Sequence, residues 1–143
     1  VVHYVDQPVE PGPITARVDE QRRTLHTRLH SAGHLIGNVG ETLGWMPIKA
    51  HHWPGEGKIT FIRGEQAQTM DAEAIQQQVN QWIAADFPRH MTLEDGTREV
   101  GFGELPAYAC GGTHVQALSE LGQVTILALS EKKGALSVRY EIN

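Results

Sequence analysis

The sequence is poor in several features, and each scarcity excludes a class of protein. It holds one cysteine among 143 residues, so no disulfide can form within the chain. It has no apolar run near the roughly 20 residues that span a bilayer, and its first residues have neither the basic start nor the apolar centre of a signal peptide. These absences favour a single globular domain over residues 1–143, located in the cytoplasm. The first residue is Val rather than Met, which leaves open whether a segment precedes it.

Positive charge is also in deficit, with 12 Lys and Arg against 17 Asp and Glu and a formal net charge of −5. Proteins that bind nucleic acids regardless of sequence rely on a summed basic field, so this composition argues against that class. Two local clusters of positive charge remain, and such clusters are usually solvated surface. They consist of Arg17, Arg22, Arg23, Arg28, Lys132 and Lys133.

The apolar pattern predicts two helices. Asp19 and Gly44 bracket a long segment with apolar residues at helical spacing, which predicts a helix between them with Pro47 just beyond its end. A second helix is predicted over about 71–86, before Pro88. Runs rich in β-branched and aromatic residues predict strands over 1–5, 14–18, 48–53, 58–63, 91–94, 98–100, 114–118, 124–130 and 136–142. The predicted fold class is therefore α+β, an antiparallel sheet packed with two main helices.

Two histidines lie about one turn apart on the first predicted helix. At 100° per residue, His30 and His34 fall almost opposite the apolar stripe that begins at Leu25. A histidine pair at this spacing is a weak signal alone, since it arises by chance on many exposed helices. Three interior glycines each weaken the helix by roughly 1 kcal/mol relative to alanine, so we expect some group to approach their side closely. They are Gly33, Gly37 and Gly40.

A second pair with the same three-residue gap lies in the run Cys110-Gly-Gly-Thr-His-Val115. Its two glycines permit a tight turn that aims both side chains at one point and leaves backbone N–H groups accessible. Thiolate sulfur and imidazole nitrogen are ligands that zinc prefers. Four protein ligands are typical of a structural zinc, whereas the polar helix face and free N–H groups favour a catalytic one, and the sequence leaves both open. The predicted zinc ligands are His30, His34, Cys110 and His114.

These motifs resemble the editing domain shared by alanyl-tRNA synthetases and stand-alone alanyl-tRNA editing proteins (the AlaX group). The resemblance covers about residues 17–142 and implies the fold of that domain. Editing domains of threonyl-tRNA synthetases share the ligand pattern but typically have Gly-Pro-His in place of Gly-Thr-His, which makes them the second candidate. The matched features are 19–23 leading into 29–36, the motif 110–115, Leu121-Gly122, and a strand pair over 130–140 that turns at Gly134.

The resemblance implies a zinc-dependent hydrolase that removes a wrong amino acid, chiefly serine and sometimes glycine, from the 3′ end of alanine tRNA. Backbone N–H groups of Gly111, Gly112 and Thr113 would then stabilise the oxyanion, and the six basic residues named above would bind the acceptor end. An inactive zinc-stabilised tRNA-binding module and a hydrolase of small esters or amides are the alternatives. A side chain that hydrogen-bonds the serine hydroxyl would exclude alanine, and the candidates are Ser31, Lys49, His51 and Thr113.

Overall fold

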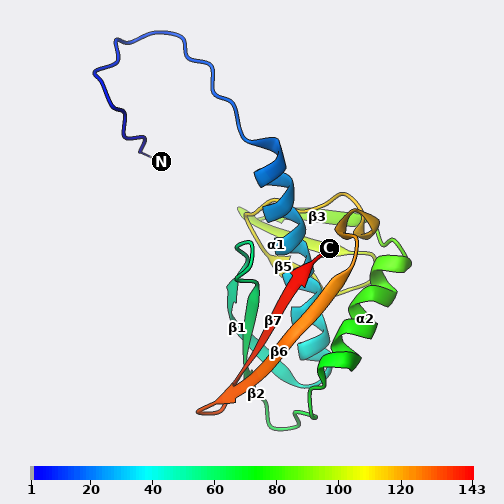
Figure 1. Cartoon of the computed structure of the whole chain (residues 1–143). Coiled ribbons are helices and arrows are strands. Elements are labelled where there is room, and N and C mark those ends of the chain that lie inside the picture. Colours follow the sequence, from blue (N-terminus) through cyan, green and yellow to red (C-terminus); the bar gives the residue numbers. More distant parts are fainter. Residues whose placement is uncertain (1) are drawn as a thin grey trace.

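The computed structural model describes residues 2–143, and Val1 lies outside them. Two helices and seven strands confirm the α+β class (Figure 1). No helix among the described residues is both long and apolar enough to cross a membrane. The elements in chain order are α1 (Glu20–Thr42), β1 (Trp45–His51), β2 (Lys58–Arg63), α2 (Ala72–Ala84), β3 (Arg89–Glu94), β4 (Thr97–Phe102), β5 (Tyr108–Ala109), the 3-10 helix η1 (Leu118–Leu121), β6 (Val124–Lys132) and β7 (Ala135–Ile142).

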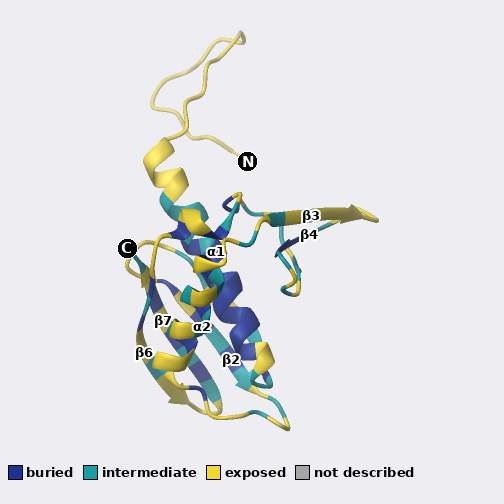
Figure 2. Ribbon diagram, turned by 90° about the vertical axis from the view of Figure 1, so that its right-hand side faces the viewer, coloured by how far each residue is buried: buried dark blue, intermediate teal, exposed yellow. Residues whose placement is uncertain are grey.

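The strands form two antiparallel sheets rather than the single sheet expected. The larger sheet has the order β1-β2-β7-β6 and the smaller one β3-β4-β5. Helix α1 packs on β1, β2 and β7, while α2 packs on β6 and against α1. Figure 2 shows the dark blue, buried middle of α1 between the larger sheet and the β3–β4 hairpin, which projects from the body. Tyr108 of β5 packs against α1 at His34 and Gly37, so this end of the smaller sheet lies against the helix.

Helix α1 has the bounds that its capping residues predict. The Asp19 carboxylate accepts a hydrogen bond from the Arg22 N–H at 2.9 Å, and Gly44 just beyond the C-cap has φ +81°. The middle of the apolar stripe is buried as expected, with Ala32 and Ile36 at most 1% exposed, whereas Leu25 and Leu43 near its ends are half-buried. The opposite side is covered too, because nearly every residue from 29 to 40 is buried. The helix is thus the centre of the domain rather than an amphipathic surface element.

The glycines of α1 mark places where aromatic rings approach the helix backbone. A methyl group at Gly40 would collide with the ring of Phe61, and one at Gly37 would lie 3.0 Å from the Tyr108 hydroxyl. One at Gly33 would meet the imidazole of His52. The close approach predicted from these glycines is therefore made by side chains of the protein itself.

Three predicted strands are absent from the described residues. Residues 2–5 of the predicted strand 1–5, and residues 14–18, are exposed and have neither helical nor strand structure. A strand is stable only when its backbone pairs with another, and no segment pairs with these two runs despite their β-branched residues. The third, over 114–118, is reduced to one bridge between Pro88 and Ala117 and then enters η1.

The strands predicted over 48–53 and 58–63 form and pair as an antiparallel hairpin, but the first of them begins earlier. Strand β1 starts at Trp45 and contains Pro47, which was expected to lie outside regular structure. Proline is tolerated there because β1 is the edge of its sheet and needs no hydrogen bond from that nitrogen. The two-residue strand β5 is too short to leave a pattern in the sequence.

Candidate metal centre

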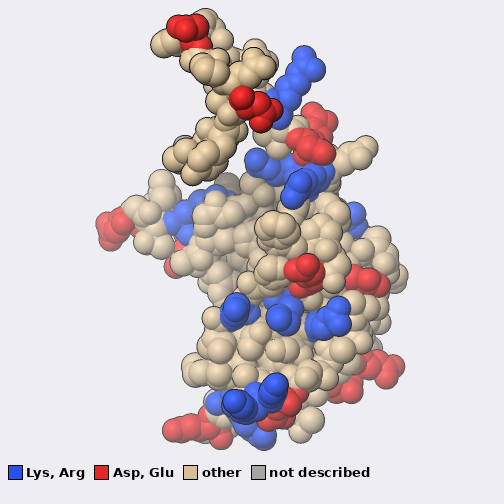
Figure 3. Space-filling model, turned by 60° about the vertical axis from the view of Figure 1, so that its left-hand side comes forward, with Lys and Arg blue, Asp and Glu red and all other residues tan. Residues whose placement is uncertain are grey.

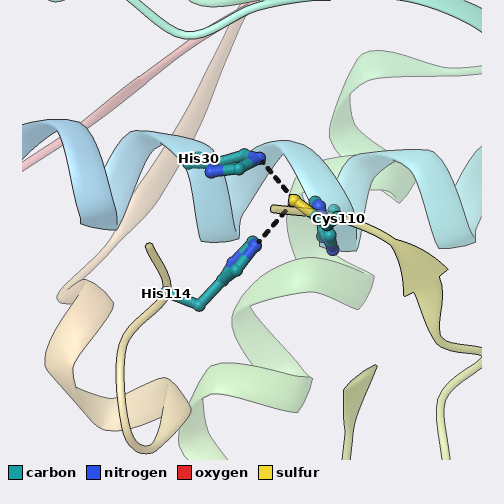
Figure 4. Close-up of side chains that lie close together, drawn as sticks. His30, Cys110 and His114 are labelled. Atoms are coloured by element: carbon teal, nitrogen blue, oxygen red, sulfur yellow. Dashed lines mark hydrogen bonds between the residues drawn. The ribbon is translucent and has the colours of Figure 1, made fainter. Parts of the chain in front are cut away.

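The structure brings the four predicted ligands together, and Figure 4 labels three of them, His30, Cys110 and His114. One donor atom from each of His30, His34, Cys110 and His114 lies within 4.8 Å of all the others. Cys110 Sγ is 3.4 Å from Nε2 of His30 and 3.4 Å from Nε2 of His114. Tetrahedral zinc with its usual bond lengths separates a sulfur and a nitrogen ligand by about 3.6 Å. The donor set and its spacing therefore fit a zinc ion.

Each half of the cluster comes from a different part of the fold. His30 and His34 are one turn apart in α1, whereas Cys110 directly follows β5 and His114 lies in the loop before η1. Two arginines fix this loop. Arg98 donates to the carbonyls of Gly111 and Gly112 at 3.2 and 2.8 Å, and Arg89 donates to that of His114 at 2.8 Å. The second ligand pair is thus held by β3 and β4, and sequence patterns carry no sign of these contacts.

The ring of His114 is fixed in one tautomer by Ser31. The Ser31 hydroxyl lies 3.0 Å from His114 Nδ1, donates to the Thr27 carbonyl at 3.0 Å and accepts from the Val115 N–H at 3.2 Å. Its one proton goes to the carbonyl, so Nδ1 must carry the proton shared with Ser31. Nε2 therefore keeps its lone pair and faces Cys110. Such outer hydrogen bonds orient histidine ligands in metal sites.

The cluster histidines are neutral at physiological pH. Burial lowers the pKa of His34 to about 3, helped by the neighbouring His30 and His52. Burial also lowers the pKa of His114 to about 2, helped by the other histidines and by Arg98 and Arg89. The pKa of His30 is lowered by burial as well, against an opposing hydrogen bond to the Thr113 backbone. Neutral imidazole is the form that binds a metal.

His34 differs from its neighbours because Nδ1 of its ring is buried and has no hydrogen-bond partner among residues 2–143. The ring is 9% exposed and meets the edge of the Tyr108 ring, with centroids 5.0 Å apart. Buried polar atoms without partners are rare in folded proteins and call for an explanation. A metal ion bound by the cluster would explain this buried nitrogen.

An open cleft of about 330 Å³ lies over the cluster, with His30, His34 and Cys110 among its lining residues. His52, in the turn after β1, lines the same cleft and was not among the site residues that the sequence motifs indicated. Its Nδ1 lies 2.8 Å from the Tyr140 hydroxyl, which donates to the Leu29 carbonyl at 2.9 Å. His52 Nδ1 is therefore the donor, and Nε2 keeps a lone pair. Burial lowers the pKa of His52 to about 4, so the ring is neutral.

The four predicted substrate-binding side chains lie in different surroundings. Lys49 lines the cleft. His51 lies outside the cleft and is 2.9 Å from the Glu56 carboxylate, and the Thr113 hydroxyl bonds that of Thr27 at 2.8 Å. Ser31 must be reassigned, because it is 0% exposed and its hydroxyl is fully engaged with His114 and the backbone. Ser31 orients the His114 ring and offers no surface to a substrate.

The loop over 111–113 keeps part of its predicted donor capacity. The Gly112 N–H donates to Cys110 Sγ at 3.4 Å, as N–H groups beside ligand sulfurs commonly do. The N–H groups of Gly111 and Thr113 have no acceptor among the described residues. Two of the three predicted oxyanion donors therefore remain free.

The predicted tRNA-binding residues are divided between the two ends of the molecule. Arg17, Arg22 and Arg23 lie at the start of α1, whereas Lys132 and Lys133 form the tip of the β6–β7 hairpin at the opposite end (Figure 1). Arg28 is held between the carbonyls of Leu121 and Asn143, at 2.6 and 2.9 Å, which gives it a structural role. These six residues do not form one surface.

The fold and the cluster together define an α+β domain with a histidine–cysteine cluster that could hold a metal ion. Residues 97–139 match the family described as "Threonyl and Alanyl tRNA synthetase second additional domain". The chain is 30% identical to the alanyl-tRNA editing protein Aarsd1 of Mus musculus, over 92% of this chain and 37% of the relative. It is 26% identical to the alanine–tRNA ligase of Mycolicibacterium smegmatis, over 85% of this chain and 16% of the ligase.

These comparisons confirm the resemblance to the alanyl-tRNA editing group. The match extends to both kinds of relative, the editing proteins and the ligases, and it includes the segment that carries Cys110 and His114. The chain spans little more than a third of the length of the editing proteins it matches.

Proposed function

We propose that this domain hydrolyses the ester bond that joins a wrong amino acid to the 3′ end of alanine tRNA, and that it does so with zinc bound by His30, His34, Cys110 and His114. One observation carries the proposal. Three neutral imidazoles and a thiol converge beside an open cleft, in a chain whose relatives are named for alanyl-tRNA editing. Residues 1–143 would form one zinc-containing editing domain.

The access to the cluster favours catalysis over a purely structural metal. Three of the four ligands line the cleft, and His30 and Cys110 are only half-buried. A bound zinc would polarise the ester carbonyl or activate a water for attack on it. The free N–H groups of Gly111 and Thr113 would stabilise the negative charge that develops on the carbonyl oxygen. The cleft walls would hold the aminoacyl group against these donors.

Selection of serine over alanine needs a polar group that is left unpaired when alanine enters. Lys49 and His52 line the cleft and carry polar groups. His52 is the better placed of the two, because the Lys49 side chain shares the outer sheet face with Lys58, whereas the bond from His52 to Tyr140 leaves Nε2 as the acceptor. The serine hydroxyl would donate to His52 Nε2, and we expect glycine to be a weaker substrate than serine.

Alanine tRNA charged with serine, glycine or alanine, incubated with a small amount of the zinc-loaded protein, tests the proposal. We expect multiple-turnover release of serine, slower release of glycine and little release of alanine. Cys110→Ala should abolish release, whereas His90→Ala, at an exposed histidine on β3, should not. RNA binding without release of serine would instead identify an inactive binding module. Equal cleavage of free seryl esters would identify a small-ester hydrolase.

A threonine tRNA charged with serine separates the second editing candidate from the first. The description of the matched family names threonyl as well as alanyl tRNA synthetases. The relatives quoted above, in contrast, are named for alanine tRNA alone. We expect faster deacylation of the alanine tRNA. Faster deacylation of the threonine tRNA would contradict the assignment to the alanyl group.

A further inference from the structure

Three positively charged residues lie together on the face of the larger sheet that the helices leave uncovered. In β2 the buried Ile59 points to the core, so its neighbour Lys58 points to the outer face. Arg139 of β7 is the cross-strand partner of Lys58 and shares that face. Lys49 of the edge strand β1 lines the same shallow depression as Lys58 and Arg139. Figure 3, which brings the β1 side forward, shows Lys and Arg side chains across the middle of the molecule.

These cations repel one another and lack partners of opposite charge. Like charges directly opposite on neighbouring strands destabilise a sheet, and Lys58 and Arg139 stand in that relation. Among residues 2–143 no carboxylate forms a salt bridge with any of the three. The carboxylate that lines the depression, that of Glu56, is turned to His51 Nε2, 2.9 Å away. An anion from outside the chain would relieve the repulsion.

An exposed indole stands beside this depression. Trp53 directly follows β1 and is 56% exposed, yet its ring has fixed neighbours. It stacks on His51 with ring planes 14° apart and centroids 6.1 Å apart. The ring of His26 is nearly perpendicular to it, with centroids 5.9 Å apart. Large aromatic side chains exposed in this manner are platforms on which unpaired bases stack.

The depression, the indole and the metal cleft are continuous with one another. Lys49 lines both the metal cleft and the depression. His51 lines both the depression and a hollow beside Trp53, and His30 and His52 of the metal cleft line that hollow as well. A chain of alternating anions and aromatic rings laid over the edge of β1 would therefore end at the cluster.

We propose that Lys49, Lys58, Arg139, His51 and Trp53 form an RNA-end site that binds the unpaired 3′ end of the substrate. The three cations meet backbone phosphates and one base stacks on Trp53, which directs the terminal ester into the metal cleft. A duplex is excluded as the occupant, because its bases are stacked on each other and cannot reach the indole. This inference rests on the proposed function for the identity of the RNA, but the binding step itself requires no hydrolysis.

Binding of an uncharged, single-stranded RNA tetranucleotide ending in adenosine tests the RNA-end site. Fluorescence anisotropy of the labelled RNA should show Trp53→Ala weakening binding about tenfold or more, with Trp53→Phe retaining most of the affinity. Lys58→Ala and Arg139→Ala should each lower the slope of log affinity against log salt by about 0.7, the value for one phosphate contact on a single strand. Trp53→Ala should leave that slope unchanged.

The doubly substituted Lys132→Ala/Lys133→Ala protein is the matched control, because it removes two exposed charges at the far hairpin. It should bind with nearly the wild-type affinity and slope. Quenching of intrinsic tryptophan emission that occurs in the unmutated protein and is lost in Trp53→Ala gives a second readout, since Trp53 is exposed, Trp45 is 3% exposed and Trp82 is half-buried in α2. The inference is overturned if Trp53→Ala binds like wild type, if no quenching occurs, or if the control loses as much slope as Lys58→Ala.

The same variants separate this inference from the proposed function. Loss of RNA binding in Trp53→Ala together with no release of serine by the unmutated protein would overturn the editing proposal and leave the RNA-end site standing. Release of serine at the wild-type rate by Trp53→Ala, at tRNA concentrations well below saturation, would overturn the RNA-end site alone.

Discussion

His114 has a complete set of partners for a residue that lies in a loop. Its carbonyl accepts from Arg89, and its ring is oriented by Ser31, which is itself anchored to the Thr27 carbonyl of α1. The two ligand pairs are therefore joined mechanically as well as by any metal, since Ser31 lies between His30 and His34 in the helix. Loss of the Ser31 hydroxyl should therefore disturb the positions of Cys110 and His114 as well.

Ser31→Ala should weaken zinc binding. Removing the hydroxyl leaves His114 Nδ1 and the Val115 N–H without their partner, and loss of such an outer hydrogen bond typically lowers metal affinity about 10–100-fold. Competition with a chromogenic chelator measures this change. Ser137→Ala is the control, because its hydroxyl makes only a 3.4 Å contact with Thr60 on the outer sheet face. Equal zinc affinity in both variants would show that Ser31 does not position the ligand.

At the level of single residues, motif spacing predicted which side chains converge but not what holds them. The Cys-Gly-Gly-Thr-His run and the histidine pair are local patterns, and all four side chains lie together in the structure. Arg98, Ser31 and His52 are distant from their partners in sequence and carry no spacing signal. Their roles follow from contacts made only when β4, α1 and the β1–β2 turn come together.

Among the elements, α1 is unusual because three of its interior residues have no side chain. Gly40 faces Phe61, which is 0% exposed and packed in the core, so the ring has no room to withdraw. The helix and β2 approach more closely at this point than any side chain on the helix would allow. Glycine lowers the helix propensity at this position, and the close packing against β2 offsets that loss.

Gly40→Ala should destabilise the protein even though alanine is the better helix former. Alanine gains about 1 kcal/mol in propensity, but a methyl forced into a packed core typically costs about 1–3 kcal/mol, and here it meets an immobile ring. We expect a net decrease in the free energy of unfolding measured in urea. Adding Phe61→Leu should make the alanine less harmful than it is alone, because the two sites are in contact. Additive effects would argue against the contact.

Elements that are set by local signals were predicted correctly, whereas those that depend on a distant pairing partner were not. Helix α1 is bounded by Asp19 and Gly44, and the β1–β2 and β3–β4 hairpins by their turns, all of which act within a few residues. The run over 14–18 looks like a strand but has no partner, and pairing is decided elsewhere in the chain. The division of the strands into two sheets could not be predicted for the same reason.

On the scale of the whole molecule, the candidate metal centre lies at the border of the hydrophobic core. The core joins α1, α2 and the larger sheet, with residues such as Val79, Val124 and Val138 that are at most 1% exposed, and it reaches Phe102 of β4, which contacts the His114 ring. The cluster lines an open cleft at this border, so most of the core does not depend on it. The domain has enough apolar burial to fold without a metal staple, unlike a small zinc finger.

Chelation should therefore abolish hydrolysis while leaving a cooperative thermal transition. A metal present at about a thousand times its Kd adds about 4 kcal/mol to stability, so its removal should lower Tm by on the order of 10 °C. Circular dichroism with and without chelator measures the shift. Cys110→Ala should melt like the chelated protein and show no further response. A loss of the cooperative transition would instead make the zinc structural.

The sequence alone indicated the four residues of the cluster, the caps of α1, the strands of the two hairpins and the editing-type resemblance, because each rests on residues close together in the chain. Only the tertiary structure decided that α1 is buried on both sides, that Ser31 is buried against His114, and that His52 lines the cleft. It also placed Lys49, Lys58 and Arg139 on one surface, although no run of basic residues joins them. The physical reason is that sheet pairing and burial bring together residues from distant segments, and no local pattern records which segments will meet.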